Sequence, residues 1–597
     1  MSSTSTELPG TLDSLWRSMR LGFRAEPWLL TVAFAASLAA AAPDPLLALG
    51  LKFFADAADA GDATSLLLAA LFLAALSTGG WLLRILADRA NRRFADRSTV
   101  TIESHVAGLQ ATVPTIEHHE RPDHLDRLAV LRDQVFALNH LYSSLFTTIG
   151  AGFRLVVTIG LLMSVHAALG LLVVFAVPPV WISSWRAGRE RLVWETNARH
   201  DRLARHLFLV GTTAPPGKEV RVAQVGPRLI ADRRASWEKW YAAISRVRWA
   251  SAAWLAAAWG LFAVAFVGAI AFAAVGIDAS PANVLLVIAA SSRLSQYVGQ
   301  TVQEANFLRG IWLDASRKLA WLEDYATEQA DRADRGAPTE LNDGFDFEGV
   351  SFRYPGTERW VLRDVDLHLP AGAVVAVVGE NGAGKTTLVK LLGRFYEPTV
   401  GRITVDGTEL SRVRADAWRG ATAGAFQDFF RFEYRAGHTV GLGDLPRVDD
   451  RPAVERGVER AGAGDVVGTL VRGLDTQLGP TWRDGVELSF GQWQKLALAR
   501  GFMRDAPLLL ALDEPTAALD AETEHALFER YAAAARSGAI GGRVTILVSH
   551  RFSTVRMADL ILVLDGGRVA EKGSHEELMA LGGRYAELYG MQAESYR

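Results

Sequence analysis

Two long stretches in the first half of the chain, residues 63–83 and residues 249–277, contain no charged residue. An α-helix needs about 20 mainly apolar residues to cross the hydrocarbon core of a bilayer, so both stretches are long enough. Four more mainly apolar segments lie in the same part of the chain: residues 27–54, 141–165, 166–185 and 281–307. The pattern predicts an α-helical transmembrane domain with six spans.

The charges between these segments predict an orientation. Only acidic residues lie between the first two spans and between the last two: Asp56, Asp59, Asp62 and Asp278. Residues 84–97 and 186–248 are rich in arginine, and basic loops stay in the cytoplasm. We therefore expect a multi-pass protein of the cytoplasmic (inner) membrane, with both ends of the chain in the cytoplasm.

The segment before the first span is amphipathic. Residues 11–24 place Leu12, Leu15, Trp16, Met19 and Phe23 on one helical face, which predicts a cytoplasmic elbow helix within residues 1–26. The alternative is a secretory signal that ends at the small residues 40–42. It is disfavoured because the leader is too long and no soluble protein follows.

Composition excludes several classes of function. The 597 residues carry a formal net charge of −3, which offers no basic surface for nucleic acid. The absence of cysteine excludes disulfides, thiolate metal sites and cysteine nucleophiles. The length predicts several domains, which we place as a transmembrane domain at 27–325, a polar linker at 326–344 and a second domain at 345–597.

Charged and amide side chains interrupt the predicted spans. Arg154 lies in the third span, and Asp44 lies between two prolines in the first. The sixth span carries a polar stripe made of Arg293, Gln296, Gln300, Gln303 and Glu304. Because ionisable residues inside a membrane are costly, we expect these groups to line a water-filled substrate cavity. The alternative is that they pair with one another and hold the helices together.

The second domain contains a glycine-rich loop at residues 379–386, which is its first motif with a chemical role. It follows a predicted strand at 374–378 and precedes a predicted helix from 387, which is the setting of a phosphate-binding loop. Gly382 and Gly384 let backbone N–H groups approach phosphate, Lys385 reaches the β- and γ-phosphates, and the Thr386 hydroxyl ligates Mg²⁺. The sequence therefore predicts a nucleotide site in an α/β domain.

Two further elements point to phosphate chemistry. The apolar run 508–512 is typical of a buried parallel strand, and Asp513 at its end is positioned to hold Mg²⁺. Just upstream, in Leu-Ser-Phe-Gly-Gln at residues 488–492, Ser489 and Gln492 have the spacing of a helix capping box. The free N–H groups of such a helix attract anions. Taken alone, this motif favours an ordinary capped surface helix.

The phosphate loop, the pentapeptide and the acidic pair occur in the order found in the ATP-binding cassette (ABC) family, which the second domain resembles. The resemblance implies an ATP site with Mg²⁺, and it assigns the general base for the attacking water to Glu514. It implies that the nucleotide of one copy is also touched by the pentapeptide of a second copy, so the working unit is a dimer.

Further positions are assigned by the same resemblance. The loop residues that bind ATP include Gly379, Asn381 and Thr387, and the pentapeptide contributes Ser489, Gly491 and Gln492. Four more residues match by order: Gln427 as the Mg²⁺-sensing glutamine, His550 at the γ-phosphate, Tyr354 stacking on adenine and Asp520 at the dimer contact. Phe490 departs from the family pattern, which has a glycine at that place.

The whole chain is similar to exporter-type ABC half-transporters. In this chain, residues 114–125 and 218–225 occupy the places where such transporters have coupling helices. This similarity implies ATP-driven export by an alternating-access homodimer or heterodimer. The alternative is a weakly hydrolysing or regulatory half of a heterodimer, which the intact Glu514 and His550 argue against. The cargo is not readable, since fold does not fix cargo. Drugs, lipids and peptides are all open, and the charges in the spans hint at a polar or zwitterionic cargo.

Overall fold

The computed structural model describes residues 8–307, 312–330, 333–514, 542–549 and 552–595. The chain divides into two compact units, and each is described by itself. Unit 1 comprises Met1–Gly108 and Leu128–Leu322, and unit 2 comprises Leu109–Arg127 and Glu323–Arg597. Long helices cross the boundary between the units, so short pieces of three of them belong to unit 2.

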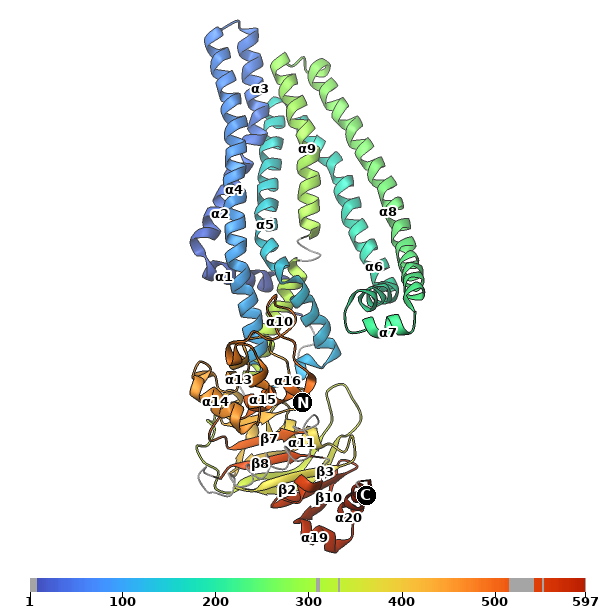
Figure 1. Ribbon diagram of the computed structural model, residues 1–597. Coiled ribbons are helices and arrows are strands. Elements are labelled where there is room, and N and C mark those ends of the chain that lie inside the picture. Colours follow the sequence, from blue (N-terminus) through green and yellow to red (C-terminus); the bar gives the residue numbers. More distant parts are fainter. Residues whose placement is uncertain (1–7, 308–311, 331–332, 515–541, 550–551, 596–597) are drawn as a thin grey trace. The chain divides into compact units, whose positions relative to one another are not determined.

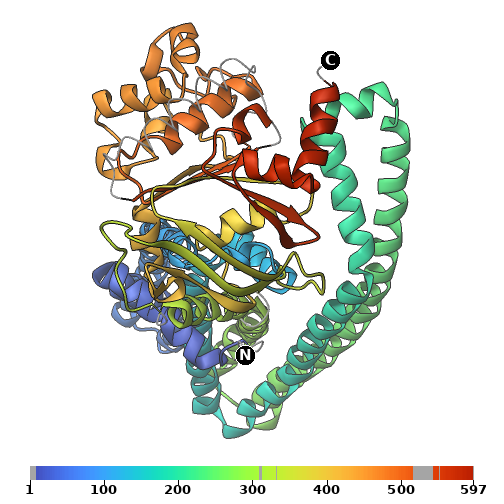
Figure 2. The ribbon, with the colours of Figure 1, turned by 90° about the horizontal axis from the view of Figure 1, so that it is seen from below.

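Unit 1 is helical throughout its described part (Figure 1). Its helices are α1 (Thr11–Ala25), α2 (Pro27–Ala41), α3 (Pro43–Asp59), α4 (Ala63–Thr112), α5 (Pro122–Val165), α6 (Leu172–Thr212), α7 (Gly217–Val222), α8 (Gly226–Ala271), α9 (Pro281–Phe307) and α10 (Leu313–Ala330). Helices α6 and α8 run side by side in both views, while α9 packs against α3 and α6 (Figures 1 and 2).

Five helical segments in the described part are long and apolar enough to cross a membrane. They are Pro27–Asp59, Ala63–Thr112, His140–Val165, Ala167–Glu190 and Gly226–Gly276, and they match the first five predicted spans. The sixth predicted span is the helix α9, which falls outside this set because its polar stripe lowers its mean hydropathy. The predicted membrane-embedded helical domain is confirmed, while the count of six spans stays a prediction.

The first span is bent at its proline pair. Helix α2 ends at Ala41 and α3 begins at Pro43, with Ala42 between them in helical conformation. Prolines 43 and 45 have no backbone N–H to donate to the preceding turn, so the hydrogen-bond ladder is interrupted there. The bend places Asp44 in the middle of a membrane segment, next to the backbone groups whose hydrogen-bond ladder is interrupted.

Unit 2 has an α/β core with two sheets (Figure 2). The four-stranded antiparallel sheet has the order β2-β1-β4-β5, and the six-stranded sheet has the order β10-β9-β3-β8-β7-β6. In the second sheet β3 pairs in parallel with β8 and β9, and β7 pairs in parallel with β6 and β8. This confirms the predicted α/β domain after the helical domain.

Strands β3 and β7 agree to within one residue with the strands predicted at 374–378 and 508–512. The strands are β1 (Gly344–Phe352), β2 (Leu362–Pro370), β3 (Val374–Gly379), β4 (Val400–Val405), β5 (Thr408–Glu409), β6 (Thr422–Ala425), β7 (Leu509–Asp513), β8 (Val544–Val548), β9 (Leu560–Asp565) and β10 (Arg568–Gly573). The helices include α11 (Lys385–Leu392), α13 (Ala436–Gly441), α14 (Arg451–Arg460), α15 (Gly464–Thr469), α16 (Phe490–Gly501), α19 (His575–Leu581) and α20 (Arg584–Ser595). Helix α10 continues to Ala330, inside the predicted linker.

Candidate nucleotide site and polar cavity

The phosphate loop joins the buried strand β3 to helix α11. Its glycines Gly379, Gly382 and Gly384 have positive φ angles of 149°, 83° and 107°. A Cβ atom at Gly379 would lie 2.3 Å from the carbonyl oxygen of Leu564, so side chains are excluded there. The loop therefore turns sharply. The free N–H groups at the N-terminus of α11 point into this turn and suit an anion such as phosphate.

Lys385 lies folded over this loop. Its Nζ atom donates to the carbonyl oxygens of Gly379 at 2.8 Å and Glu380 at 3.0 Å. Burial lowers the pKa of Lys385, and the carboxylates of Glu514 and Asp513 oppose that shift. A bound phosphate would favour the charged ammonium in the same way.

Asp513 ends strand β7 and is 1% exposed. Neither of its carboxylate oxygens has a hydrogen-bond partner among the described residues. Burial raises the pKa of Asp513, as do Glu514 and Asp428, while the Thr386 hydroxyl and the Lys385 ammonium oppose the shift. A buried carboxylate without donors, next to a hydroxyl oxygen, fits the oxygen ligands that Mg²⁺ prefers.

Glu514 follows with a φ of 46°, which side chains rarely adopt. Its N–H donates to the carbonyl oxygen of Val548 at 3.0 Å. Its Oε2 accepts a hydrogen bond from Gln427 Nε2 at 2.8 Å, and its backbone oxygen accepts one from Gln494 Nε2 at 3.4 Å. The structure thus brings together two of the three residues to which the family resemblance assigns roles in catalysis, Glu514 and Gln427.

The pentapeptide forms the predicted capping box, which the structure confirms. Ser489 is the N-cap of α16, its hydroxyl accepts from the Gln492 N–H at 3.3 Å, and Gln492 Oε1 accepts from the Ser489 N–H at 2.9 Å. Phe490 and Gly491 take the first helical positions, whose N–H groups have no partner within the helix. The Phe490 ring is 53% exposed.

Tyr354 lies beside the phosphate loop. Its hydroxyl is 3.0 Å from Thr387 Oγ1, and the edge of its ring meets Tyr396 with 5.3 Å between centroids. The exposed Asn381 lies in the loop itself. The predicted residues Asp520 and His550 lie outside the described residues.

A segment between α4 and α5 docks within unit 2, where we predicted a coupling helix at 114–125. The Ile116 N–H donates to the carbonyl oxygen of Phe395 at 3.1 Å, and Arg419 donates to the carbonyl oxygen of Pro114. The Tyr396 hydroxyl donates to Glu120. Tyr396 therefore contacts both the docked segment and Tyr354 of the nucleotide site. The second predicted segment, at 218–225, contains the short exposed helix α7 in unit 1.

A polar cavity of about 590 Å³ lies within unit 1. Its lining includes the predicted residues Asp44, Arg154, Arg293, Gln296 and Gln300, together with Glu304. The side chain of Gln303 is outside the described part. Arg84, Asp88 and Tyr297 also line the cavity and were not predicted. Tyr297 lies one helical turn after Arg293, so the spacing of the stripe was a signal for it.

The charges of this cavity are partly paired. Arg293 forms an ion pair with Asp44, Arg84 lies 3.4 Å from the same carboxylate, and the Tyr297 hydroxyl donates to it at 3.0 Å. Arg154 packs over the Tyr297 ring, with 5.4 Å from its Cζ to the centroid. Within the described residues, Arg154 forms no ion pair and its Nε atom has no hydrogen-bond partner. Both predicted alternatives, lining and pairing, are therefore present in one cluster.

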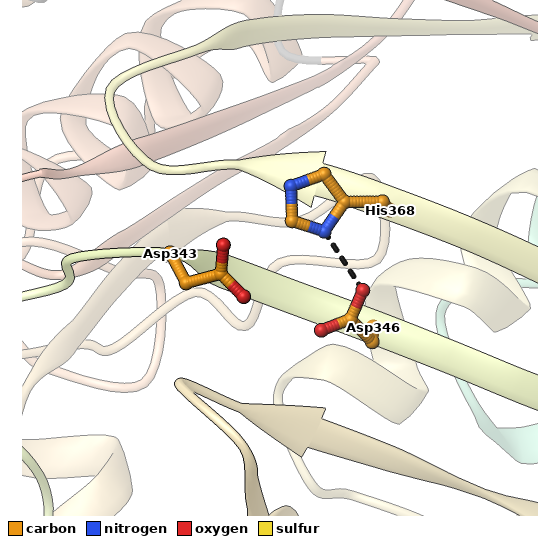
Figure 3. Close-up of side chains that lie close together, drawn as sticks. All are labelled: Asp343, Asp346 and His368. Atoms are coloured by element: carbon orange, nitrogen blue, oxygen red, sulfur yellow. Dashed lines mark hydrogen bonds and ion pairs between the residues drawn. The ribbon is translucent and has the colours of Figure 1, made fainter.

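A separate polar cluster lies on the antiparallel sheet of unit 2. Three side chains, those of Asp343, Asp346 and His368, each have an oxygen or nitrogen atom that could bind a metal ion, and these atoms lie within 4.8 Å of one another. Figure 3 shows the His368 ring directed at Asp346. The hydrogen bond between Asp346 and His368 is 2.7 Å long, and the two residues are direct cross-strand neighbours of β1 and β2. A cross-strand hydrogen bond between Asp346 and His368 accounts for this arrangement.

The family model described as ABC transporter matches residues 362–517, from strand β2 to just past the acidic pair. A solved structure described as a bacterial Atm1-family ABC exporter with ATP bound has the same fold, with a TM-score of 0.77 and 23% sequence identity. That match covers 95% of this chain and 99% of the other. The family model thus assigns an ABC transporter domain to residues 362–517, and the structural likeness shows that the chain has the fold of that exporter.

Part of the chain is also similar to curated proteins. The chain is 42% identical over 257 residues to the ATP-dependent lipid A-core flippase of Pseudomonas fluorescens, and 36% identical over 314 residues to that of Pseudomonas aeruginosa. These alignments cover 42% and 53% of this chain, and 41% and 50% of the two relatives. The chain thus spans about half the length of the curated relatives it matches.

Proposed function

We propose that this chain is one half of a dimeric ATP-driven exporter of the cytoplasmic (inner) membrane, with its nucleotide domain in the cytoplasm. The observation that carries the proposal is the convergence of Lys385, Asp513, Glu514 and Gln427 at the carboxyl ends of the parallel strands β3, β7 and β6 of one sheet. Ligands of α/β sheets bind at this edge. The composition and the spacing of the same residues match phosphoryl transfer from ATP.

The roles follow from the contacts. Lys385 and the N–H groups of the loop hold the phosphates, and Thr386, Asp513 and Gln427 would hold Mg²⁺. When bound, the ion would supply positive charge that stabilises the phosphate oxygens. Glu514, oriented by Gln427, accepts a proton from the water that attacks the γ-phosphate. By the resemblance to the ABC family, Tyr354 would stack on adenine and His550 would contact the γ-phosphate.

The dimer completes the site. The exposed N-terminus of α16 offers the N–H groups of Phe490 and Gly491 and the Ser489 hydroxyl, which suit the phosphates of a second copy. Asp520 would lie at the same contact. A second candidate function, the weakly hydrolysing half of a heterodimer, is favoured by one observation only, the Phe490 ring in place of a glycine.

ATP hydrolysis by the purified chain tests the proposal. In lipid nanodiscs, we expect the full-length chain to hydrolyse ATP, and Glu514→Gln to lower the rate at least about 100-fold while ATP still binds. Glu455→Gln, which changes an exposed acid on α14, is the matched control and should leave the rate unchanged. If the chain dimerises and binds ATP without hydrolysis above the Glu514→Gln level, a homodimeric pump is wrong.

For the cargo, we propose a lipid with a polar, charged head group that enters the cavity of unit 1. The cavity lining holds three arginines and three acids, Arg84, Arg154, Arg293, Asp44, Asp88 and Glu304, so it suits a cargo with both charges. The relatives are named lipid flippases, which favours a lipid over a drug or a peptide. Arg154 is the cation most available to it, since Arg293 is already paired with Asp44.

Arg154→Ala tests this assignment in proteoliposomes that carry fluorescent phosphatidylethanolamine. We expect ATP-dependent movement of the labelled lipid between leaflets to fall several-fold, while basal ATP hydrolysis stays within about twofold. Arg228→Ala, which removes an exposed arginine of α8 paired with Asp232, is the control. Equal lipid movement in both variants would contradict the role of Arg154, and loss of folding in Arg154→Ala alone would support a purely structural role.

A further inference from the structure

Phe490 makes contacts that a glycine at this place could not make. Its ring lies 5.4 Å from the ring of Phe429, measured between centroids, at an angle of 42°. The guanidinium of Arg431 lies over the same ring at 5.8 Å, and Arg431 also lies 3.8 Å from Glu487, just before the pentapeptide. Aromatic pairs and cation–π contacts of this kind are attractive. The N-terminus of α16 is therefore held to residues 429–431 by side chains.

Residues 429–431 are the direct continuation of Gln427, which holds the carboxylate of Glu514. A second connection runs behind the first. Arg500, near the end of α16, donates to the carbonyl oxygen of Phe430 at 3.3 Å and 3.4 Å and lies over the Phe432 ring at 4.8 Å. Gln494 of the same helix reaches the backbone oxygen of Glu514. Helix α16 thus contacts the segment after Gln427 near both of its ends, and its Gln494 contacts the backbone of Glu514.

These contacts join two sites of the proposed dimer. Gln427 and Glu514 serve the ATP held by this chain, whereas the N-terminus of α16 serves the ATP held by the partner. A displacement of Gln427 reaches α16 through Phe429 and Phe490, because their rings lie in contact. Where a glycine stands, the contact with Phe429 is missing, and the connection depends on the Arg431–Glu487 pair and on the contacts of Arg500.

We propose that Phe490 is a positioning residue that couples the two ATP sites of the dimer through its contact with Phe429. The inference rests on the proposed function, since it requires two nucleotide sites. Occupation of one site then changes the affinity of the other, and this coupling is reciprocal. The Phe490 ring thereby regulates the ATP sites without touching the reacting atoms, whereas the backbone N–H of the same residue serves the partner's phosphates.

The test is a double-mutant cycle read out as cooperativity. Rates of ATP hydrolysis against ATP concentration are measured for Phe490→Ala, for Phe429→Leu, which keeps an apolar group against the core, and for both together. We expect the Hill coefficient to fall from about 1.5 or more to about 1 in each single variant, with no further fall in the double variant. Phe490→Tyr, which keeps the ring, should restore the wild-type coefficient. Phe430→Leu, a change of the exposed neighbouring ring, is the matched control.

Two results would overturn the inference: a Hill coefficient that stays at the wild-type value in both single variants, or one that is already about 1 in the wild-type chain. Calorimetric titration of ATP into the Glu514→Gln background repeats the comparison without turnover. A chain that binds ATP cooperatively but does not hydrolyse it would contradict the proposed pump while leaving the Phe490 coupling supported.

Discussion

Glu514 combines an unfavourable backbone with a fixed side chain. A φ of 46° costs a residue other than glycine about 1 kcal/mol or more, and such conformations persist where the surroundings determine them. Here the N–H of Glu514 is bonded to Val548 and its carboxylate to Gln427. The strained turn directs the carboxylate away from the axis of β7, whereas Asp513 stays buried at its end. Two adjacent acids thus acquire different surroundings and different tasks.

Although Ser489 and Phe490 are neighbours, we expect them to contribute unequally to the rate of ATP hydrolysis. Ser489→Ala removes the N-cap hydroxyl, which stabilises a helix by about 1 kcal/mol, and one group proposed for the partner's phosphate. Phe490→Gly leaves the capping box and every backbone N–H in place. We therefore predict that Ser489→Ala lowers the rate of ATP hydrolysis more than Phe490→Gly does. Many-fold faster turnover in Phe490→Gly would instead identify the pentapeptide as degenerate and favour a heterodimer.

At the scale of elements, the docked segment between α4 and α5 connects the membrane helices to unit 2. Its backbone is bonded to Phe395 and Arg419, and its Glu120 accepts from Tyr396. Close by, His118 is buried with both ring nitrogens lacking a hydrogen-bond partner among the described residues. Burial, together with the neighbouring His119, lowers the pKa of His118 to about 4.

This buried histidine makes the docked segment sensitive to acid. Because the folded pKa of about 4 lies below the unfolded value of 6.5, the unfolded segment binds the proton more readily. Stability is therefore fully present above pH 6.5 and falls as the pH drops toward 4. We predict faster hydrogen exchange in residues 109–127 at pH 5 than at pH 7.5, after correction for intrinsic rates. His118→Phe should reduce this difference, and an unchanged difference would show that other groups cause it.

The elements differ in how far the sequence determines them. The strands β3, β7 and β8 were predictable, because continuous apolar runs bounded by glycine or acids define buried parallel strands. The capping box of α16 was predictable because it depends on residues three positions apart. The assignment of residues 109–127 to unit 2 was not, since it depends on contacts with Phe395, Tyr396 and Arg419 some 280 to 300 residues away. The contact of Phe490 with Phe429 is a long-range contact of the same kind.

At the scale of the whole molecule, each unit contains one of the two sites that the proposed function requires. Unit 1 encloses a cavity in which arginines and acids are only partly paired, and unit 2 holds the phosphate loop, the acidic pair and the capped helix. Neither site explains export by itself. The docked segment, which continues directly into α4 and α5, and helix α10 supply covalent connections between the two units.

The most direct test of the account asks whether ATP brings the phosphate loop of one copy against α16 of the other. The chain has no cysteine, so Asn381→Cys and Phe490→Cys can be introduced into the Glu514→Gln background without further changes. With a short thiol crosslinker, the account predicts a covalent dimer on denaturing gels that forms only with ATP and only when both cysteines are present. Lys385→Ala should abolish it. A dimer band of equal strength without ATP, or no band in a sample that binds ATP, would contradict the account.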